Sequence, residues 1–246
     1  MSEKYSVEKV YSNKKIDEDI YEITIKGKFE GKPGQFYMLR AWEWEPTLSR
    51  PISINNIDEE KITFLYRVFG RGTEILSKLN MGDEIKITGP LGNGFDIEKI
   101  KGKIAIVAGG IGIAPMRYLI NKLENCNVDL HVGFKSMSKT VDNVEKNVNN
   151  FYLSTEKGDA GYKGYVTDLL KVEDYDTILC CGPEIMMKKV IRMCEEKKVP
   201  VYVSMENRMA CGIGACLVCT CKTKSGRKRS CKDGPVFLGE ELLIND

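Results

Sequence analysis

Several features that mark common classes of protein are scarce or missing in this sequence. No apolar run approaches the roughly 20 residues that a membrane-spanning helix needs. The N-terminal stretch MSEKYSVEKV also lacks the apolar segment of a secretory signal peptide. The formal net charge is only +2, which is too balanced for a nucleic-acid-binding protein. We therefore expect a cytoplasmic protein with neither a membrane nor a nucleic acid as a partner.

Histidine is almost absent as well. The one histidine, His131, stands in the alternating segment VDLHVGF, which is typical of a strand. We expect this side chain to pack inside a sheet and to take no part in catalysis.

Cysteine, by contrast, is abundant. The chain of 246 residues has nine, and without a secretion signal they fit a reducing compartment in which disulfides are rare. Cys211, Cys216 and Cys219 follow the spacing C-x4-C-x2-C, and Cys231 lies further on. This is the plant-type spacing for four thiolates on a [2Fe–2S] cluster. The two glycines between the first two cysteines would let backbone amides approach the sulfurs.

Two other interpretations of these cysteines remain open, a zinc knuckle and buried thiols without a ligand. Zinc sites usually have two CxxC-like pairs, whereas here only Cys216 and Cys219 form one. Cys221 makes a C-x-C pair with Cys219 and competes as the fourth ligand. We favour Cys231, because the fourth ligand of the plant-type pattern comes from a separate segment.

The pattern of apolar and turn residues divides the chain into three regions. Residues 1–100 contain short alternating segments broken by turn residues, which predicts an antiparallel β-barrel. Residues 101–204 alternate apolar strands with helical periods, which predicts a parallel α/β sheet. Residues 205–246 hold the cysteine loop and a tail. The predicted strands are 5–11, 19–27, 35–41, 62–68, 83–89, 103–110, 129–134, 150–155 and 176–182, and the predicted helices are 73–79, 113–124 and 183–197.

Two glycine-bearing turns follow predicted strands of the second region. Glycine lets a backbone approach a pyrophosphate closely, and the start of a helix offers free N–H groups. The order of the glycines differs from G-x-G-x-x-G, so a plain strand–helix turn is the alternative. The candidate nucleotide-binding residues are Gly109, Gly110, Gly112, Ala114, Pro115, Cys181, Gly182 and Pro183.

The first region carries candidate flavin-binding residues. Arg50 offers a planar donor fork for a phosphate, and Ser53 can donate to a flavin ring. Gly72 and Thr73 open the short predicted helix, where a phosphate can also bind. Taken singly, each has a structural alternative: a strand arginine, a core position or a helix cap.

The order of these motifs is more specific than any one of them. R-P-x-S, G-T, GPLGNGF, GGIGIAP and CGP resemble the ferredoxin–NADP⁺ reductase superfamily, in which an FAD-binding barrel precedes a nicotinamide-nucleotide domain. With CGIGACLVC added, the chain is similar to the electron-transfer subunits of NAD-dependent (class 1B) dihydroorotate dehydrogenase, from residue 33 to residue 237. Many reductases have tyrosine where this chain has Ile52, which puts ring stacking there in doubt.

This resemblance implies which residues would bind each cofactor. FAD would be held by Arg50, Pro51, Ile52, Ser53, Leu65, Tyr66, Arg67, Gly72 and Thr73. NAD would bind at the two glycine turns, and the [2Fe–2S] cluster at Cys211, Cys216, Cys219 and Cys231. The three regions then become an FAD-binding barrel (1–100), an NAD-binding domain (101–204) and a cluster segment (205–246). Lys135 and Lys139 could meet the 2′-phosphate of NADP, although the family uses NAD.

The resemblance also implies a role. Nicotinamide exchanges electrons in pairs and an iron–sulfur cluster one at a time, whereas a flavin handles both. The chain would pass electrons from the FMN of a TIM-barrel dihydroorotate dehydrogenase subunit to NAD⁺ in pyrimidine (UMP) biosynthesis, in a heterotetramer of two subunits of each kind. It would carry no catalytic residue for dihydroorotate, since three cofactor sites occupy its length and the partner's barrel needs about 250 residues of its own.

Alternatives to this role remain. The chain would otherwise be the nicotinamide-reducing subunit of a hydrogenase or of a ferredoxin:NADP oxidoreductase, or a zinc-stabilised nucleotide-sensing module. The basic run is either a solvated hairpin or a docking surface. It consists of Lys222, Lys224, Arg227, Lys228, Arg229 and Lys232.

Overall fold

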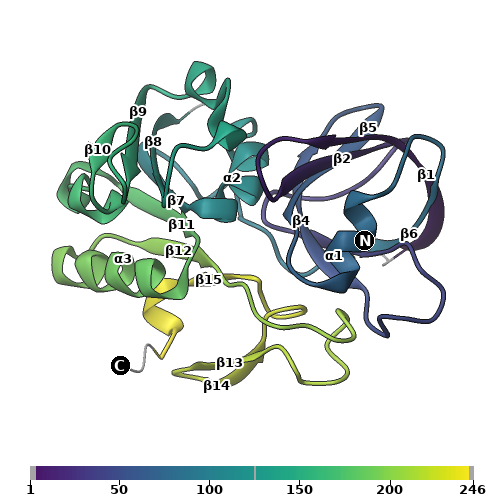
Figure 1. Cartoon of the computed structure of the whole chain (residues 1–246). Helices are drawn as coiled ribbons and strands as arrows, with labels where there is room; N and C mark the ends of the chain where they lie inside the picture. Colours follow the sequence, from purple (N-terminus) through teal and green to yellow (C-terminus); the bar gives the residue numbers. More distant parts are fainter. Residues whose placement is uncertain (1–3, 125, 244–246) are drawn as a thin grey trace.

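The computed structural model describes residues 4–124 and 126–243, which form three parts packed against one another (Figure 1). A closed β-barrel comes first, a mostly parallel sheet with helices second, and the cysteine-bearing segment last. The fold class predicted from the sequence is therefore confirmed. In the described part of the chain, no helix has the length and apolar character that a membrane crossing requires.

The barrel is built from six antiparallel strands and one short helix. Its elements are β1 (Lys4–Lys15), β2 (Ile20–Lys26), β3 (Phe36–Arg40), β4 (Arg50–Ile57), β5 (Lys61–Arg67), α1 (Arg71–Ser77) and β6 (Glu84–Leu91). The strands close in the order β1-β2-β5-β4-β3-β6. Successive side chains of a strand point to opposite faces. On β3, Tyr37 and Leu39 thus enter the barrel core, whereas Phe36 and Met38 face outward.

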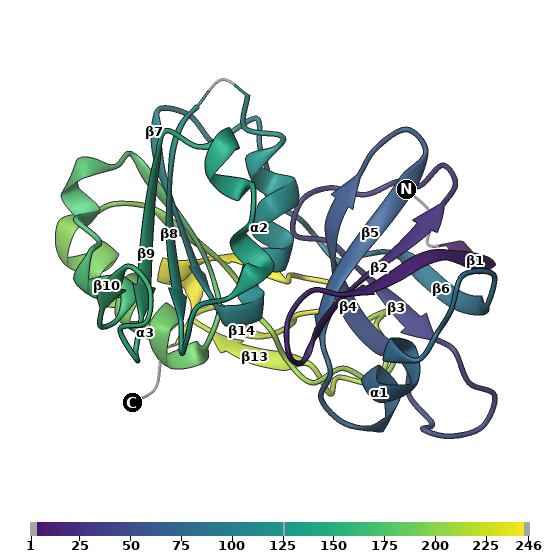
Figure 2. The same ribbon diagram turned by 45° about the horizontal axis from the view of Figure 1, so that its top comes forward.

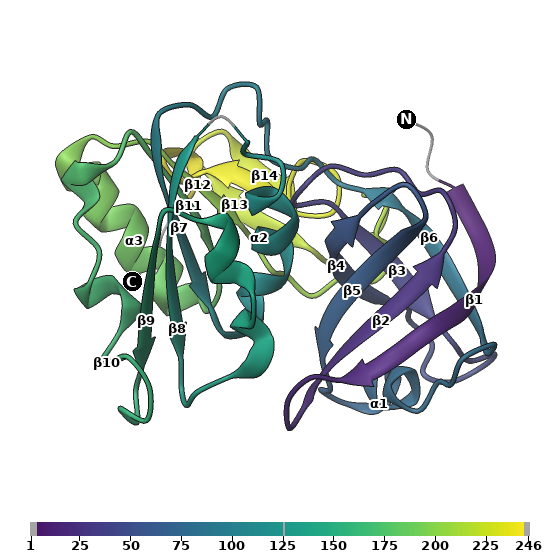
Figure 3. The ribbon, with the colours of Figure 1, turned by 90° about the horizontal axis from the view of Figure 1, so that it is seen from above.

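The second part is a seven-stranded sheet covered by helices on both faces. Its elements are β7 (Lys103–Gly109), α2 (Ile113–Ile120), β8 (Asn127–Phe134), β9 (Asn150–Thr155), β10 (Tyr162–Lys163), β11 (Thr177–Cys181), α3 (Glu184–Lys197), β12 (Val201–Ser204) and β15 (Val236–Leu238). The strand order is β10-β9-β8-β7-β11-β12-β15, and only β15 runs antiparallel to its neighbour. Figure 3 shows α2 on the face toward the barrel and α3 on the opposite face.

Short elements complete the chain. The hairpin of β13 (Thr220–Thr223) and β14 (Gly226–Arg229) follows the cysteine loop. Single turns of 3₁₀ helix lie at Gly110–Gly112, Lys139–Val141, Val144–Asn147, Val166–Asp168, Val172–Asp174 and Gly239–Glu241. The strand β15 was not predicted, and it comes from the cysteine segment although it extends the sheet of the second part. The domain boundaries after residues 100 and 204 thus stay predictions.

Shared apolar clusters join the three parts. Ile20 and Leu65 of the barrel belong to the same buried cluster as Ile113 and Met116 of α2. A second cluster joins outward-facing Phe36 and Met38 of β3 to Leu91, Cys219 and Cys231. Figure 2 shows the cysteine-bearing segment extending from the sheet to the barrel. Because apolar burial is the main stabilising contribution, the sites on the three parts are held at set positions relative to one another.

His131 is a packed strand residue, as predicted. It lies on β8 with only 1% of its surface exposed, and its ring stacks on Tyr152 with 4.4 Å between centroids. Its Nε2 lies 3.0 Å from the hydroxyl of Tyr175, which donates to Asp129. Desolvation lowers the pKa of His131 to about 4, with Lys103 acting in the same direction and Asp129 opposing it.

This buried histidine predicts acid sensitivity. The imidazole of the unfolded chain takes up a proton near its ordinary pKa of about 6.5, whereas the folded chain resists protonation down to about 4. The stabilisation is therefore complete above pH 6.5 and is lost as the pH falls toward 4, by about 3 kcal/mol in total. Urea unfolding across this range should show the loss. The variant His131→Gln should lack this part of the pH dependence, and equal slopes in both proteins would contradict the assignment.

Candidate functional site

The two predicted nucleotide loops lie against each other at the carboxyl ends of β7 and β11. A Cβ atom on Gly112 would collide with the carbonyl oxygen of Cys181, and one on Gly109 would lie 2.6 Å from Cδ of Pro183. Gly110 has a φ of +54°, a conformation that most residues avoid. Side chains are therefore excluded from this contact, and the backbone itself forms the floor of the site.

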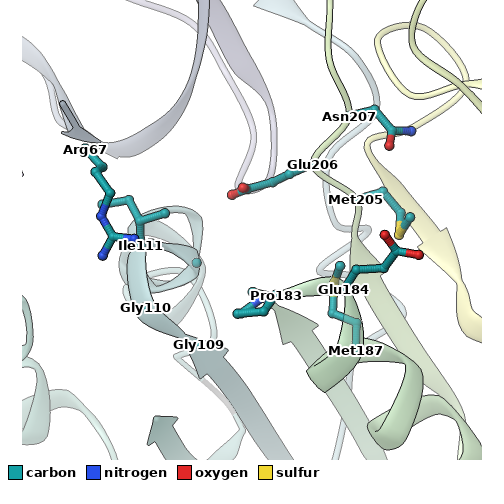
Figure 4. A pocket seen from close by; sticks show the side chains of 12 residues that line it. Arg67, Gly109, Gly110, Ile111, Pro183, Glu184, Met187, Met205, Glu206 and Asn207 are labelled. Carbon is teal, nitrogen blue, oxygen red and sulfur yellow. The ribbon is translucent and has the colours of Figure 1, made fainter. Parts of the chain in front are cut away.

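A cavity of about 270 Å³ lies above these loops (Figure 4). It sits where the strand order reverses between β7 and β11, which is where open α/β sheets bind ligands. Its lining comes from the barrel, both loops, α3 and the segment that leads into the cysteine loop. The lining residues are Arg67, Gly109, Gly110, Ile111, Gly112, Gly182, Pro183, Glu184, Met187, Met205, Glu206 and Asn207.

Arg67 and Glu206 face this cavity from different parts of the chain. Arg67, at the end of β5, forms an ion pair with Asp19 at 3.1 Å and lies 3.9 Å from the place of a Cβ on Gly110. It was predicted as a flavin residue, and the structure puts it between the barrel and the nucleotide loops. In Figure 4, the Glu206 carboxylate points into the cavity. Although water reaches this side chain, desolvation raises its pKa and Arg67 opposes the change. Sequence reasoning missed Glu206, because no motif marks an acidic residue after β12.

Three other predicted nucleotide residues are not among those that line the cavity. Ala114 and Pro115 lie buried in the first turn of α2, and Cys181 ends β11 with no exposed surface. Proline suits the first turn of a helix, since the N–H that it lacks would have no partner there. These side chains shape the loops, and their part in nucleotide binding remains a prediction.

Arg50 offers the barrel a site for an anion. It lies at the start of β4, half-buried, with its guanidinium 5.5 Å from the ring of Trp42. The guanidinium covers Gly72, where a Cβ would lie 2.5 Å from Nε of Arg50. No carboxylate of the described residues lies within salt-bridge distance of Arg50. Arg50 donates only to the carbonyl of Leu48 and has no carboxylate partner among the described residues, so a cation beside the start of α1 fits one phosphate of a dinucleotide.

The other residues predicted for the flavin differ in where their side chains lie. Pro51 and Ser53 are cross-strand partners of Met38 and Phe36, and so share the outer face of the barrel. The hydroxyl of Thr73 is already engaged, since it accepts from the N–H of Phe69 at 2.7 Å and donates to the carbonyl of Gly70 at 3.1 Å.

Three of the predicted flavin residues pack toward apolar cores. Leu65 is 2% exposed and Tyr66 1%, and the Tyr66 hydroxyl donates to Asn13 at 3.1 Å. Ile52 packs against the barrel core. Leu65 and Tyr66 can therefore reach a cofactor only with their backbone, and their role stays a prediction.

The four predicted cluster ligands are arranged as two pairs. The N–H of Cys216 donates to Sγ of Cys211 at 3.4 Å, and the N–H of Cys231 donates to Sγ of Cys219 at 3.4 Å. Two thiolates for each of two irons is the demand of a [2Fe–2S] cluster. Over residues 4–124 and 126–243, no three His, Cys, Asp or Glu side chains converge on one metal ion.

Cys221 lies outside this arrangement. It belongs to β13, its Sγ donates to the carbonyl of Lys228 at 3.5 Å, and it packs beside the apolar cluster under α3. Cys219 and Cys231 are both buried against the barrel, whereas Cys216 is exposed. Cys231 as the fourth ligand stays a prediction, to be tested against Cys221.

The backbone around Cys211 favours a thiolate. Desolvation alone would raise its pKa, but N–H groups of Cys216, Ile213 and Ala215 outweigh it and lower the pKa to about 6. Desolvation and the neighbouring Cys219 raise the pKa of Cys231 to about 12. Thiolates are the form that ligates metal, so the loop backbone favours ligation by Cys211.

Known proteins agree with this geometry. A family model described as the iron–sulfur cluster binding domain of dihydroorotate dehydrogenase B matches residues 206–243. The electron transfer subunit of dihydroorotate dehydrogenase B (NAD(+)) from Clostridium acetobutylicum is 70% identical over 246 residues, which covers 100% of both chains. The chain belongs to the family of dihydroorotate dehydrogenase B electron transfer subunits. The subunit from Clostridium perfringens is 48% identical, with 98% of this chain and 99% of that protein covered.

Solved structures of reductases share the fold of this chain. An NADH-dependent reduced ferredoxin-NADP oxidoreductase superposes with a TM-score of 0.86 and 30% identity, covering 97% of this chain and 90% of that one. A ferredoxin NADP⁺ reductase from Neisseria gonorrhoeae, solved with bound FAD and NADP, has a TM-score of 0.65 at 15% identity, with coverage of 83% and 94%. The second likeness shows the fold alone.

Proposed function

We propose that this chain is the electron-transfer subunit of an NAD-dependent dihydroorotate dehydrogenase, in pyrimidine (UMP) biosynthesis. It takes electrons from the FMN of a dihydroorotate-oxidising subunit and delivers them to NAD⁺. When bound, FAD and the [2Fe–2S] cluster supply the exchange between single electrons and electron pairs. The chain's own residues bind these groups, set their spacing and exclude water between them.

The packing of the cluster loop on the barrel carries this proposal. Cys219 and Cys231 lie in one apolar cluster with Phe36 and Met38 of β3. The cross-strand partners of those two residues are Ser53 and Pro51 of the predicted flavin motif. A flavin on that motif and a cluster on those thiols would thus be separated by a single, water-free layer of side chains. The nucleotide cavity also borders the barrel, because Arg67 of β5 and Gly110 of the nucleotide loop both line it.

The exposed part of the cluster loop fits a partner subunit. Cys216 is exposed, and Ile213, Leu217 and Val218 beside it also present apolar surface to solvent. Adjacent exposed apolar residues mark interaction surfaces. We propose that an FMN-containing TIM-barrel subunit docks here, in a cytoplasmic heterotetramer of two subunits of each kind. The nine free cysteines support a reducing compartment.

A second candidate function rests on the structural likeness at 30% identity. The ferredoxin-NADP oxidoreductase named above shares nearly the whole fold, so a role in such an enzyme or in a hydrogenase is the alternative. The relative at 70% identity favours the dihydroorotate role. A zinc-stabilised nucleotide sensor is a different class of alternative, and it would be colourless, whereas flavin and iron–sulfur groups absorb visible light.

Two assays on the purified, cofactor-loaded chain test the proposal. We expect NADH to reduce an artificial acceptor, because the nucleotide cavity and the flavin motif both belong to this chain. We expect no oxidation of dihydroorotate with NAD⁺, because that reaction needs a general base facing a second flavin. Adding the FMN subunit that co-purifies with the chain should make the oxidation of dihydroorotate with NAD⁺ possible. Turnover of dihydroorotate by the chain alone would contradict the proposed division of labour.

A further inference from the structure

Arg229 stands apart from the other residues of the basic run. It ends β14 and reaches back to the cysteine loop, where its Nη1 donates to the carbonyl of Gly214 at 3.2 Å. Its Nε and Nη2 donate to the two carboxylate oxygens of Asp233, at 2.9 and 3.0 Å. The N–H of Arg229 also donates to Asp233, at 2.7 Å. One arginine thus links the loop between the first two cysteines to the residue two places after the fourth.

Gly214 is the point at which this link meets the thiols. It lies in the loop between Cys211 and Cys216, and the N–H of Cys216 donates to the sulfur of Cys211 at 3.4 Å. The peptide bond is planar, so the carbonyl of Gly214 and the N–H of Ala215 point in opposite directions. By holding that carbonyl, Arg229 fixes the plane of the peptide bond between Gly214 and Ala215. It thereby positions the backbone that leads directly to the N–H of Cys216, the donor to the sulfur of Cys211.

No other side chain of the basic run is hydrogen-bonded to this loop, although the apolar stem of Lys232 packs over Gly214. Lys228 pairs with Glu241 at 3.0 Å, on the other face of the hairpin. Arg227 lies two residues nearer the turn than Arg229, on the same face of β14, and is exposed. Only Arg229 combines a full positive charge with bonds to the backbone that surrounds the sulfurs.

We propose that Arg229 and Asp233 form a charge pair that positions the cysteine loop and sets the reduction potential of the cluster. This inference rests on the proposed function, since it presupposes a [2Fe–2S] cluster at the four cysteines. An electron added to the cluster is stabilised by a nearby cation and by N–H donors to sulfur, and is disfavoured by a nearby carboxylate. Arg229 therefore raises the potential, and Asp233 limits that rise.

The test is a redox titration of the full, cofactor-loaded chain, followed by the electron paramagnetic resonance signal of the reduced cluster. We expect Arg229→Gln to shift the midpoint potential to more negative values and Asp233→Asn to shift it to more positive values. Arg229→Lys keeps the charge and should stay near the wild-type potential. Arg227→Gln makes the same charge change away from the sulfurs and serves as the matched control.

The outcomes separate this inference from the proposed function. A wild-type chain with flavin but no iron and sulfide would refute the cluster itself. A wild-type chain with the cluster, and Arg229→Gln and Asp233→Asn variants at the wild-type potential, would refute only the role of the charge pair. If Arg229→Gln loses the cluster, Asp233→Asn still decides: a positive shift supports the pair, and an unchanged potential overturns it. A shift in Arg227→Gln as large as that in Arg229→Gln would also overturn it.

Discussion

Replacing Cys231 by serine is expected to abolish the [2Fe–2S] cluster, whereas Cys221→Ser is expected to keep it. Cys231 lies in the buried pair with Cys219, against the barrel. Cys221 points its sulfur at the carbonyl of Lys228. A cluster of two irons that loses one of four thiolates keeps an incomplete ligand set. Iron and acid-labile sulfide, with the visible spectrum, measure the result.

Cys221→Ser is the control for Cys231→Ser, since both variants make the same chemical change within the cysteine segment. Both also remove a sulfur that is not fully exposed, so a general loss of folding would affect the two alike. Circular dichroism separates such a loss from loss of the cluster. Full iron content in Cys231→Ser together with loss in Cys221→Ser would reverse the assignment.

The variant Arg50→Ala is expected to weaken FAD binding by about 2 kcal/mol, or roughly 30-fold, the typical scale for a hydrogen bond to a charged group. Arg50 lies beside Gly72 at the start of α1, without a carboxylate partner among the described residues. Removing it would leave a phosphate there without its cation. Acid release and chromatography of the bound flavin, with fluorescence titration of the apoprotein, give the content and the affinity.

Lys61→Ala is the control for this prediction. Lys61 begins β5 at the far end of the β4–β5 hairpin from Arg50, and it pairs with Asp58 at 3.5 Å on the surface. Such exposed pairs contribute no more than about 1 kcal/mol to stability, and no effect on flavin is expected. Unchanged FAD affinity in Arg50→Ala, or FMN as the only flavin in the wild-type chain, would contradict the flavin assignment.

Local patterns of the sequence were sufficient for most elements of the fold. The segment 150–155 alternates in the way that β9 requires, and the helical period of 183–197 matches α3. The cysteine spacing likewise indicated a cluster segment, and the family model now matches it. These predictions depend on neighbours within a few residues, where periodicity and spacing act directly.

Features that depend on distant neighbours could not be predicted in this way. The strand β15 has only three residues, Val236–Leu238, and it exists because β12 presents a free edge to pair with. Leu65 and Tyr66 stand beside Arg67 in one motif, yet the first two turn into cores and only Arg67 faces the cavity. The alternation of side chains along a strand is visible in a sequence. Which of the two faces of the strand meets a ligand depends on the segments that pack against the opposite face.

The order of the parts, the cysteine spacing and the backbone loops that only glycine can form are all visible in the amino-acid sequence. The tertiary structure alone decided that Cys231 joins Cys219 while Cys221 lies apart, that Glu206 enters the nucleotide cavity, and that Arg229 is bound to Gly214 instead of being solvated. The physical reason is separation along the chain. Burial and hydrogen bonding act through space, so a residue's environment is set by segments that its neighbours in the sequence do not specify.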